Sequence, residues 1–136
     1  MYEHSFSLEI IAPDRVVFQG DVTSVSAPGT KGGFQVLFNH APFLSSLTPG
    51  PVKVKAPDGT DTIYATGGGF FEVRGNKAVV LVESAELPVD IDVARAQEAK
   101  QRAEQRLKSH DPSVDTLRAE LALARAIHRL RLTGRK

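Results

Sequence analysis

The periodicity of the chain changes between residues 87 and 96, and this change constrains the fold more than any other feature. Before it, apolar and polar residues alternate in short runs separated by Gly and Pro, a pattern typical of strands and turns. After it, apolar residues recur every three or four positions, which is typical of helices, and Asp90 or Asp92 can cap the first one. The sequence therefore predicts a β domain over residues 1–87 and a helical domain over residues 88–136.

Short strands at even spacing fill the first domain and favour a sandwich or barrel over alternating strands and helices. The glycine run Gly67–Gly69 indicates a bend or a close approach between backbones. A turn at residues 74–76 is expected to join two strands as a hairpin. The fold class predicted for the whole chain is α+β, with the strands first and the helices last.

The helical domain has two segments, joined by a short link that contains Asp111 and Pro112. We expect Asp111 to cap the second helix and Pro112 to be its first residue, so that the two helices form an antiparallel hairpin. Alanine dominates the apolar stripe of the first helix. Because burial of a methyl group contributes little, roughly 0.8 kcal/mol per carbon, the hairpin is expected to be only marginally stable by itself.

Composition excludes several classes of protein. Among the 136 residues there is no cysteine, so neither disulfides nor thiolate metal sites are expected. No apolar run is long enough to span a bilayer, and the first residues lack the features of a signal peptide. We therefore expect a cytoplasmic, bacterial type of protein.

Six basic residues follow Leu117 against one acidic residue, so the tail is basic and the remainder acidic. Such a tail indicates an anionic partner or a solvated helix end.

No catalytic or metal site is predicted. The four histidines are scattered, and no pair of them has the spacing of metal ligands. The glycine run lacks the lysine and helix of a phosphate-binding loop. Arginines are more informative, because Arg95 and Arg102 share one helix face and Arg118 and Arg125 another. If these faces meet, an anion such as a nucleotide triphosphate must lie between them; otherwise both faces are solvated.

Four stretches, in the same order along the chain, resemble the epsilon subunit family of F-type ATP synthases. The resemblance implies a ten-stranded β-sandwich followed by a two-helix hairpin. It also implies a non-catalytic subunit of the proton-translocating enzyme, located in the central stalk between the gamma subunit and the c ring, at the cytoplasmic face of the cell membrane. The stretches are residues 26–50, residues 68–86, residues 91–96 and residues 118–126.

The chain departs from the usual family residues near the part that contacts the rotor ring. Gly33 replaces an acidic residue and Gln35 replaces a glycine. Phe38 and Asn39 replace a Pro-Gly pair. These differences leave the predicted fold unchanged, but they fall where the family binds the c ring.

The resemblance also implies a regulatory ATP site on the folded hairpin. The family motif Ile/Leu-Asp-x-x-Arg-Ala is present as Ile91, Asp92, Arg95 and Ala96. In the implied site Ile91 and Ala96 flank the adenine, while Asp92 accepts hydrogen bonds from the adenine amino group or the ribose. Glu86 is expected to accept hydrogen bonds from the same groups as Asp92. The phosphates are expected to bind four arginines, which are Arg95, Arg102, Arg125 and Arg129.

In the family the hairpin also opens, and its second helix then reaches the alpha and beta subunits and inhibits ATP hydrolysis. Residues expected to make these contacts are Arg118, Arg125, Arg129 and Arg131. Two other functions remain open from the residues alone. One is a stand-alone nucleotide-binding sensor. The other is a nucleic-acid binder, which the acidic β domain and the lack of aromatic residues in the tail disfavour.

Overall fold

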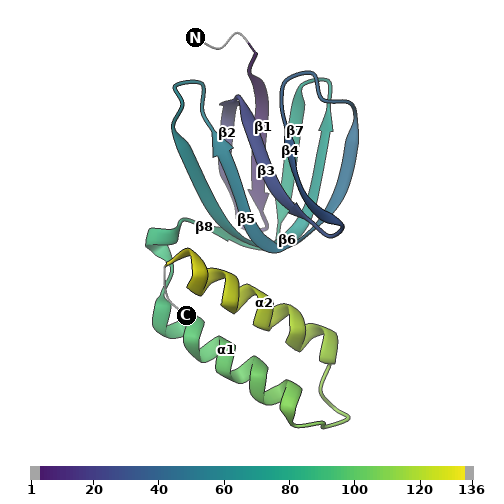
Figure 1. Ribbon diagram of the computed structural model, residues 1–136, viewed down its shortest axis with the longest axis vertical. Helices are drawn as coiled ribbons and strands as arrows, with labels where there is room; N and C mark the ends of the chain where they lie inside the picture. The colour runs from purple at the N-terminus through teal and green to yellow at the C-terminus, as the bar shows by residue number, and fades with distance from the viewer. Residues whose placement is uncertain (1–3, 134–136) are drawn as a thin grey trace. The chain divides into compact units, whose positions relative to one another are not determined.

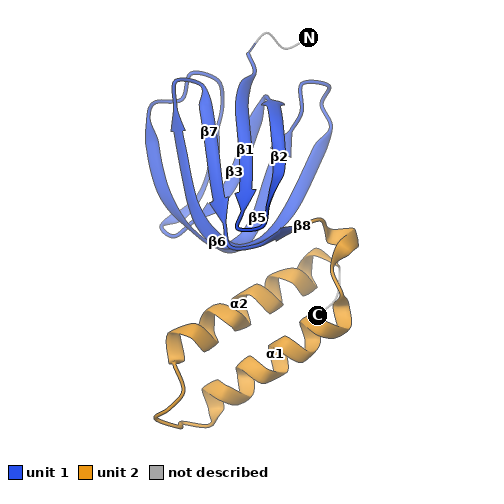
Figure 2. Ribbon diagram, turned by 180° about the vertical axis from the view of Figure 1, so that it is seen from behind, with its two compact units in different colours: residues 1–85 blue, residues 86–136 orange. Residues whose placement is uncertain are grey.

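A computed structural model describes residues 4–133 of the chain. The chain divides into two compact units, Met1–Ala85 and Glu86–Lys136, shown in blue and orange in Figure 2. The first unit contains the strands and the second contains the helices. The domain boundary expected at residue 87 lies two residues from this division. In residues 4–133 no helix is long and apolar enough to cross a membrane.

The first unit is an eight-stranded, sandwich-like sheet in which the long strands bend so that its two ends lie in different layers (Figure 1). The strand order is β2-β1-β7-β6-β5-β3-β4, and β8 pairs with β6. β1 and β7 are parallel, whereas the other pairs along this path are antiparallel. The strands are β1 Phe6–Ala12, β2 Arg15–Val22, β3 Ser24–Gly29, β4 Gly32–Val36, β5 Phe43–Lys55, β6 Asp61–Arg74, β7 Lys77–Val82 and β8 Ala85–Glu86.

The α+β fold class is confirmed, but the strand number is eight and not ten. The difference is explained by β5 and β6, each of which continues through the bend as one strand and does not divide into two. Their backbones remain paired through the bend, with Leu47 opposite Gly69 and Pro49 opposite Gly67. Because the ladder continues on both sides, each segment is one long, bent strand that contributes to both layers.

The glycine run lies at this bend, and the expected close approach between backbones is confirmed. Gly69 has a φ of 154°, and a Cβ atom built there would lie 1.9 Å from the carbonyl oxygen of Leu81. Gly68 has a φ of 96°, a region that other residues rarely adopt. The bend therefore requires glycine both for its backbone conformation and for its proximity to β7.

The core of the first unit follows from the alternation seen in the sequence. Phe6, Leu8 and Ile10 point inward along β1 and are almost completely buried. Phe71 is fully buried, and its ring makes an edge-to-face contact with Phe34 at a centroid distance of 5.0 Å. Burial of each such side chain contributes about 1.5–3 kcal/mol. This packing fixes the inward face of every long strand.

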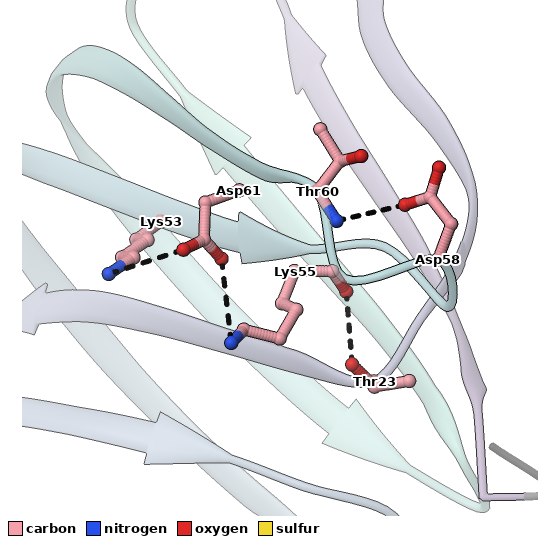
Figure 3. A network of polar contacts seen from close by, with 6 residues as sticks. All are labelled: Thr23, Lys53, Lys55, Asp58, Thr60 and Asp61. Carbon is pink, nitrogen blue, oxygen red and sulfur yellow. Dashed lines mark hydrogen bonds and ion pairs between the residues drawn. The ribbon is translucent and has the colours of Figure 1, made fainter. Parts of the chain in front are cut away.

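Polar contacts hold one end of the sandwich (Figure 3). Asp61 pairs with Lys53 at 3.8 Å and with Lys55 at 3.9 Å. The hydroxyl of Thr23 donates to the carbonyl oxygen of Lys55 at 3.3 Å. In the turn before Asp61, the backbone N–H of Thr60 donates to Asp58 and lowers the pKa of that carboxyl. These contacts join the start of β3 to the β5–β6 hairpin.

Asn39 is the residue that stands where the family usually has glycine, and its φ is 63°. Asparagine tolerates this left-handed conformation better than most residues. The Asn39 N–H donates to Oδ1 of Asn76 at 2.7 Å, and Nδ2 of Asn76 donates back to Oδ1 of Asn39 at 3.0 Å. The departure at this position therefore keeps the turn and adds a link to the β6–β7 hairpin.

The second unit begins with a 3₁₀ turn, Pro88–Asp90, followed by α1, Val93–Lys108, and α2, Thr116–Leu132. Asp92 caps α1 by accepting from the N–H of Arg95 at 3.1 Å. This decides between the two expected caps, because Asp90 lies in the 3₁₀ turn.

The predicted start of the second helix is wrong. The carboxylate of Asp111 accepts from both the N–H and the hydroxyl of Ser113 at 2.9 Å, which closes a local turn. α2 starts at Thr116 with Asp115 as its cap. The seam between the helices is rich in alanine as expected, but in α2 it is formed by Ala119, Ala126 and Leu130, and not by the exposed Leu117 and Leu121.

Candidate nucleotide-binding site

A hollow of about 250 Å³ lies between α1 and α2 within the helical unit. Its small alanine side chains leave space between the helices, and long arginine side chains surround that space. We call it the arginine hollow. The lining residues are Ala99, Arg102, Ala103 and Arg106 from α1, and Ala122, Arg125, Ala126 and Arg129 from α2.

Two of the four arginines are paired with carboxylates. Nε of Arg129 forms an ion pair with Oε1 of Glu86, whose side chain is 24% exposed. Nη1 of Arg102 lies 4.0 Å from Oε2 of Glu98, one turn earlier on the same helix, a spacing at which opposite charges on a helix meet. Within residues 4–133, Arg106 and Arg125 form no ion pair. The arginine hollow therefore carries an excess of positive charge.

This arrangement is suited to a polyanion. Guanidinium groups bind phosphate oxygens through two parallel hydrogen bonds, and they remain charged at any physiological pH. The two unpaired guanidinium groups add positive charge beside the two that carboxylates neutralise, so an anion in the hollow would lower their mutual repulsion. A phosphate chain supplies several negative charges in a narrow shape, which matches both the charge and the size of the hollow.

The structure brings together part of the expected ATP site. Glu86, Arg102, Arg125 and Arg129 lie at or beside the arginine hollow. Arg106 lies there too and was missed in the sequence, although it is one helical turn beyond Arg102 and so on the same face.

The motif residues lie at the start of α1 and do not line the arginine hollow. Asp92 is the helix cap, Arg95 is exposed, and Ala96 is 1% exposed because it packs in the seam. Ile91 is also buried. These residues have clear structural roles in the folded hairpin, and their nucleotide-binding role stays a prediction.

The four arginines expected to make inhibitory contacts are divided in the folded hairpin. Arg125 and Arg129 line the arginine hollow and are half-buried, whereas Arg118 and Arg131 are exposed. Of these four arginines, two are therefore partly buried in the folded hairpin, and Arg129 is also held by its ion pair with Glu86. As for metals, residues 4–133 contain no cluster of three or more histidine and carboxylate side chains.

Comparison with known proteins identifies the family. Residues 5–88 match the model described as ATP synthase, Delta/Epsilon chain, beta-sandwich domain, and residues 90–134 match ATP synthase, Delta/Epsilon chain, long alpha-helix domain. The chain belongs to the ATP synthase delta/epsilon family. As a member, it is a subunit of a larger enzyme complex and not an enzyme by itself. The two matched domains meet between residues 88 and 90, close to the division between the compact units.

Relatives in the delta/epsilon family extend along almost the whole chain. The ATP synthase epsilon chain of Nitratidesulfovibrio vulgaris (strain DP4) is 48% identical over 132 residues, covering 97% of this chain and 98% of the relative. The ATP synthase epsilon chain of Moorella thermoacetica is 42% identical over 130 residues, covering 96% and 97%.

A solved structure with the same fold is a chain of the Euglena gracilis mitochondrial ATP synthase OSCP/F1/c-ring assembly. Its TM-score is 0.78 at 24% identity, covering 88% of this chain and 76% of that one. The likeness shows that the two chains share a fold over most of their lengths.

Proposed function

We propose that this protein is the regulatory central-stalk subunit of a bacterial, proton-translocating ATP synthase, and that its folded hairpin binds ATP. The regulatory part of this proposal rests on one observation, which is the arginine hollow with its excess positive charge between two weakly packed helices. ATP is a ligand of the resting protein in this proposal and not a substrate or an obligatory cofactor.

In the proposed complex the phosphates of ATP bind Arg102, Arg125 and Arg129. Arg95, at the start of α1, binds the phosphate nearest the ribose. Ile91 and Ala96 flank the adenine, and Asp92 and Glu86 accept hydrogen bonds from the amino group or the ribose. When phosphate replaces Glu86 beside Arg129, the Glu86 carboxylate becomes available to the nucleoside.

Isothermal titration of the isolated protein with MgATP tests this proposal. Arg125→Ala removes an unpaired guanidinium from the arginine hollow and is expected to weaken binding by about 1.5–3 kcal/mol, the range of hydrogen bonds to charged groups. Arg131→Ala is the matched control, because Arg131 is on the same helix and lines no part of the hollow. Equal affinities for the two variants would favour solvated arginine faces over a nucleotide site.

The β unit is proposed to bind the gamma subunit and the c-subunit ring. A row of apolar side chains crosses four strands in register, with Val16 opposite Ile11, Ile11 opposite Leu81, and Leu81 opposite Phe70. Val16, Leu81 and Phe70 are each at least half exposed. An exposed apolar row of this length is typical of a protein interface, which supports the gamma subunit as its partner.

Through these partners the protein is proposed to lie peripherally at the cytoplasmic face of the cell membrane. The hairpin is proposed to reach the alpha and beta subunits when it opens. A stand-alone nucleotide sensor would use the same arginine hollow without any rotary partner. Co-purification separates the two functions, because the stalk subunit requires a stable complex with gamma and the sensor requires nucleotide only.

A further inference from the structure

A second hollow continues from the arginine hollow toward the link between α1 and α2. It measures about 320 Å³, and Arg106 lines both hollows. Arg118 lines only the second. We call the five arginines of the two hollows the arginine row: Arg102, Arg106, Arg118, Arg125 and Arg129.

The positive charge of the arginine row increases toward the link. Arg102 and Arg129 are neutralised by Glu98 and Glu86, but within residues 4–133 neither Arg106 nor Arg118 forms an ion pair. Among residues 4–133, Asp115 is the one acid that lines the second hollow, and its Oδ1 accepts a hydrogen bond from the N–H of Arg118 at 3.1 Å as the cap of α2. The part of the row without paired carboxylates therefore extends beyond the arginine hollow.

The length of the row suits an extended ligand that carries charge along its whole length. Arg102 and Arg106 are four residues apart on one helix face, about 6 Å along the axis, and both face the space between the helices. A linear phosphate chain presents the same charged group at every step, so a longer chain can meet further guanidinium groups in the second hollow. A nucleoside triphosphate ends after three such groups.

We propose that the hairpin binds linear inorganic polyphosphate along the arginine row, with Arg106 as a phosphate-binding residue shared by ATP and longer chains. Arg118 binds only chains that extend into the second hollow. This inference rests on the proposed ATP binding for the position of the first phosphates. It adds a ligand class that has no base or ribose.

The test is isothermal titration of the full chain at fixed ionic strength with three probes: MgATP, inorganic tripolyphosphate and a longer polyphosphate of defined length. The variants are Arg106→Gln and Arg118→Gln, and Arg131→Gln is the matched control that removes an equal charge outside both hollows. Circular dichroism of each variant checks that the helices are retained. The same charge is lost in all three variants, so any difference in their affinities depends on where the replaced arginine lies.

We expect Arg106→Gln to weaken binding of all three probes about three- to tenfold relative to Arg131→Gln. Arg118→Gln is expected to weaken only the longer polyphosphate by a similar factor. The inference is overturned if both variants bind every probe as Arg131→Gln does, or if the longer chain binds no tighter than tripolyphosphate. If the wild-type protein binds long polyphosphate but not MgATP, the proposed ATP site is contradicted. Polyphosphate binding along the arginine row is then still supported.

Discussion

Single residues in this protein show how backbone conformation limits substitution. Gly69→Ala is expected to destabilise the β unit by at least about 3 kcal/mol, because the new Cβ would overlap the carbonyl of Leu81 in a region of φ that alanine avoids. Gly75→Ala is the control, since Gly75 also has a positive φ, 58°, but open space around it. Thermal unfolding of both variants measures the difference. Equal losses would mean that φ alone, and not the contact, determines the cost.

Asn39 offers a second test at the same scale. Asn39→Ala is expected to cost about 1 kcal/mol more than Asn39→Gly, because both lose the hydrogen bond from Asn76 but only alanine is strained at a φ of 63°. Chemical denaturation of the two variants gives the free energies of unfolding. If Asn39→Gly is as destabilised as Asn39→Ala, the side-chain hydrogen bond is what this position requires.

At the scale of elements, the link between α1 and α2 depends on the ionised form of Asp111. Hydrogen bonds from Ser113 hold the pKa of this carboxyl below its ordinary value of 3.8. A lowered pKa in the folded state means that the link is stabilised at pH values above 3.8 and loses this stabilisation as the pH falls through the folded pKa. The helical unit is therefore expected to weaken below about pH 4.

This prediction is checked by following helix content against temperature from pH 6 to pH 2, in wild type and in Asp111→Asn. Asparagine keeps an oxygen acceptor for Ser113 but does not titrate in this range. Identical acid profiles for the two proteins would show that Asp111 contributes nothing to the link.

At the scale of the whole molecule, we propose that the helical unit is a two-state brake. Its seam buries mainly alanine, so a few kcal/mol from a ligand or partner would suffice to shift it between the folded form and the proposed open form. Deletion of the chain after Ser113 removes α2, and hydrolysis by the assembled enzyme is expected to rise. The rise should be largest at low ATP, since ATP bound at the proposed site would stabilise the folded form by RT ln(1 + [L]/Kd).

ATPase rates of wild-type and truncated complexes across ATP concentration provide the measurement. Replacement of Arg118 and Arg131 by Ala in the full-length chain is the companion variant, because it keeps α2 and removes its exposed charge. Superimposable curves at low ATP would mean that the hairpin does not restrain the motor.

The sequence by itself determined the α+β class, the position of the joint, a helix cap at Asp90 or Asp92, the alanine-rich stripe of the first helix and a bend or close approach at Gly67–Gly69. These are local properties, set by periodicity, capping side chains and backbone freedom within a few residues. Tertiary structure decided the rest. β5 and β6 each remain one strand because the partner strand pairs on both sides of the bend. Arg106 faces Arg125 and Arg129 in one hollow because the register between two helices depends on how their alanines pack, and no local pattern encodes that register.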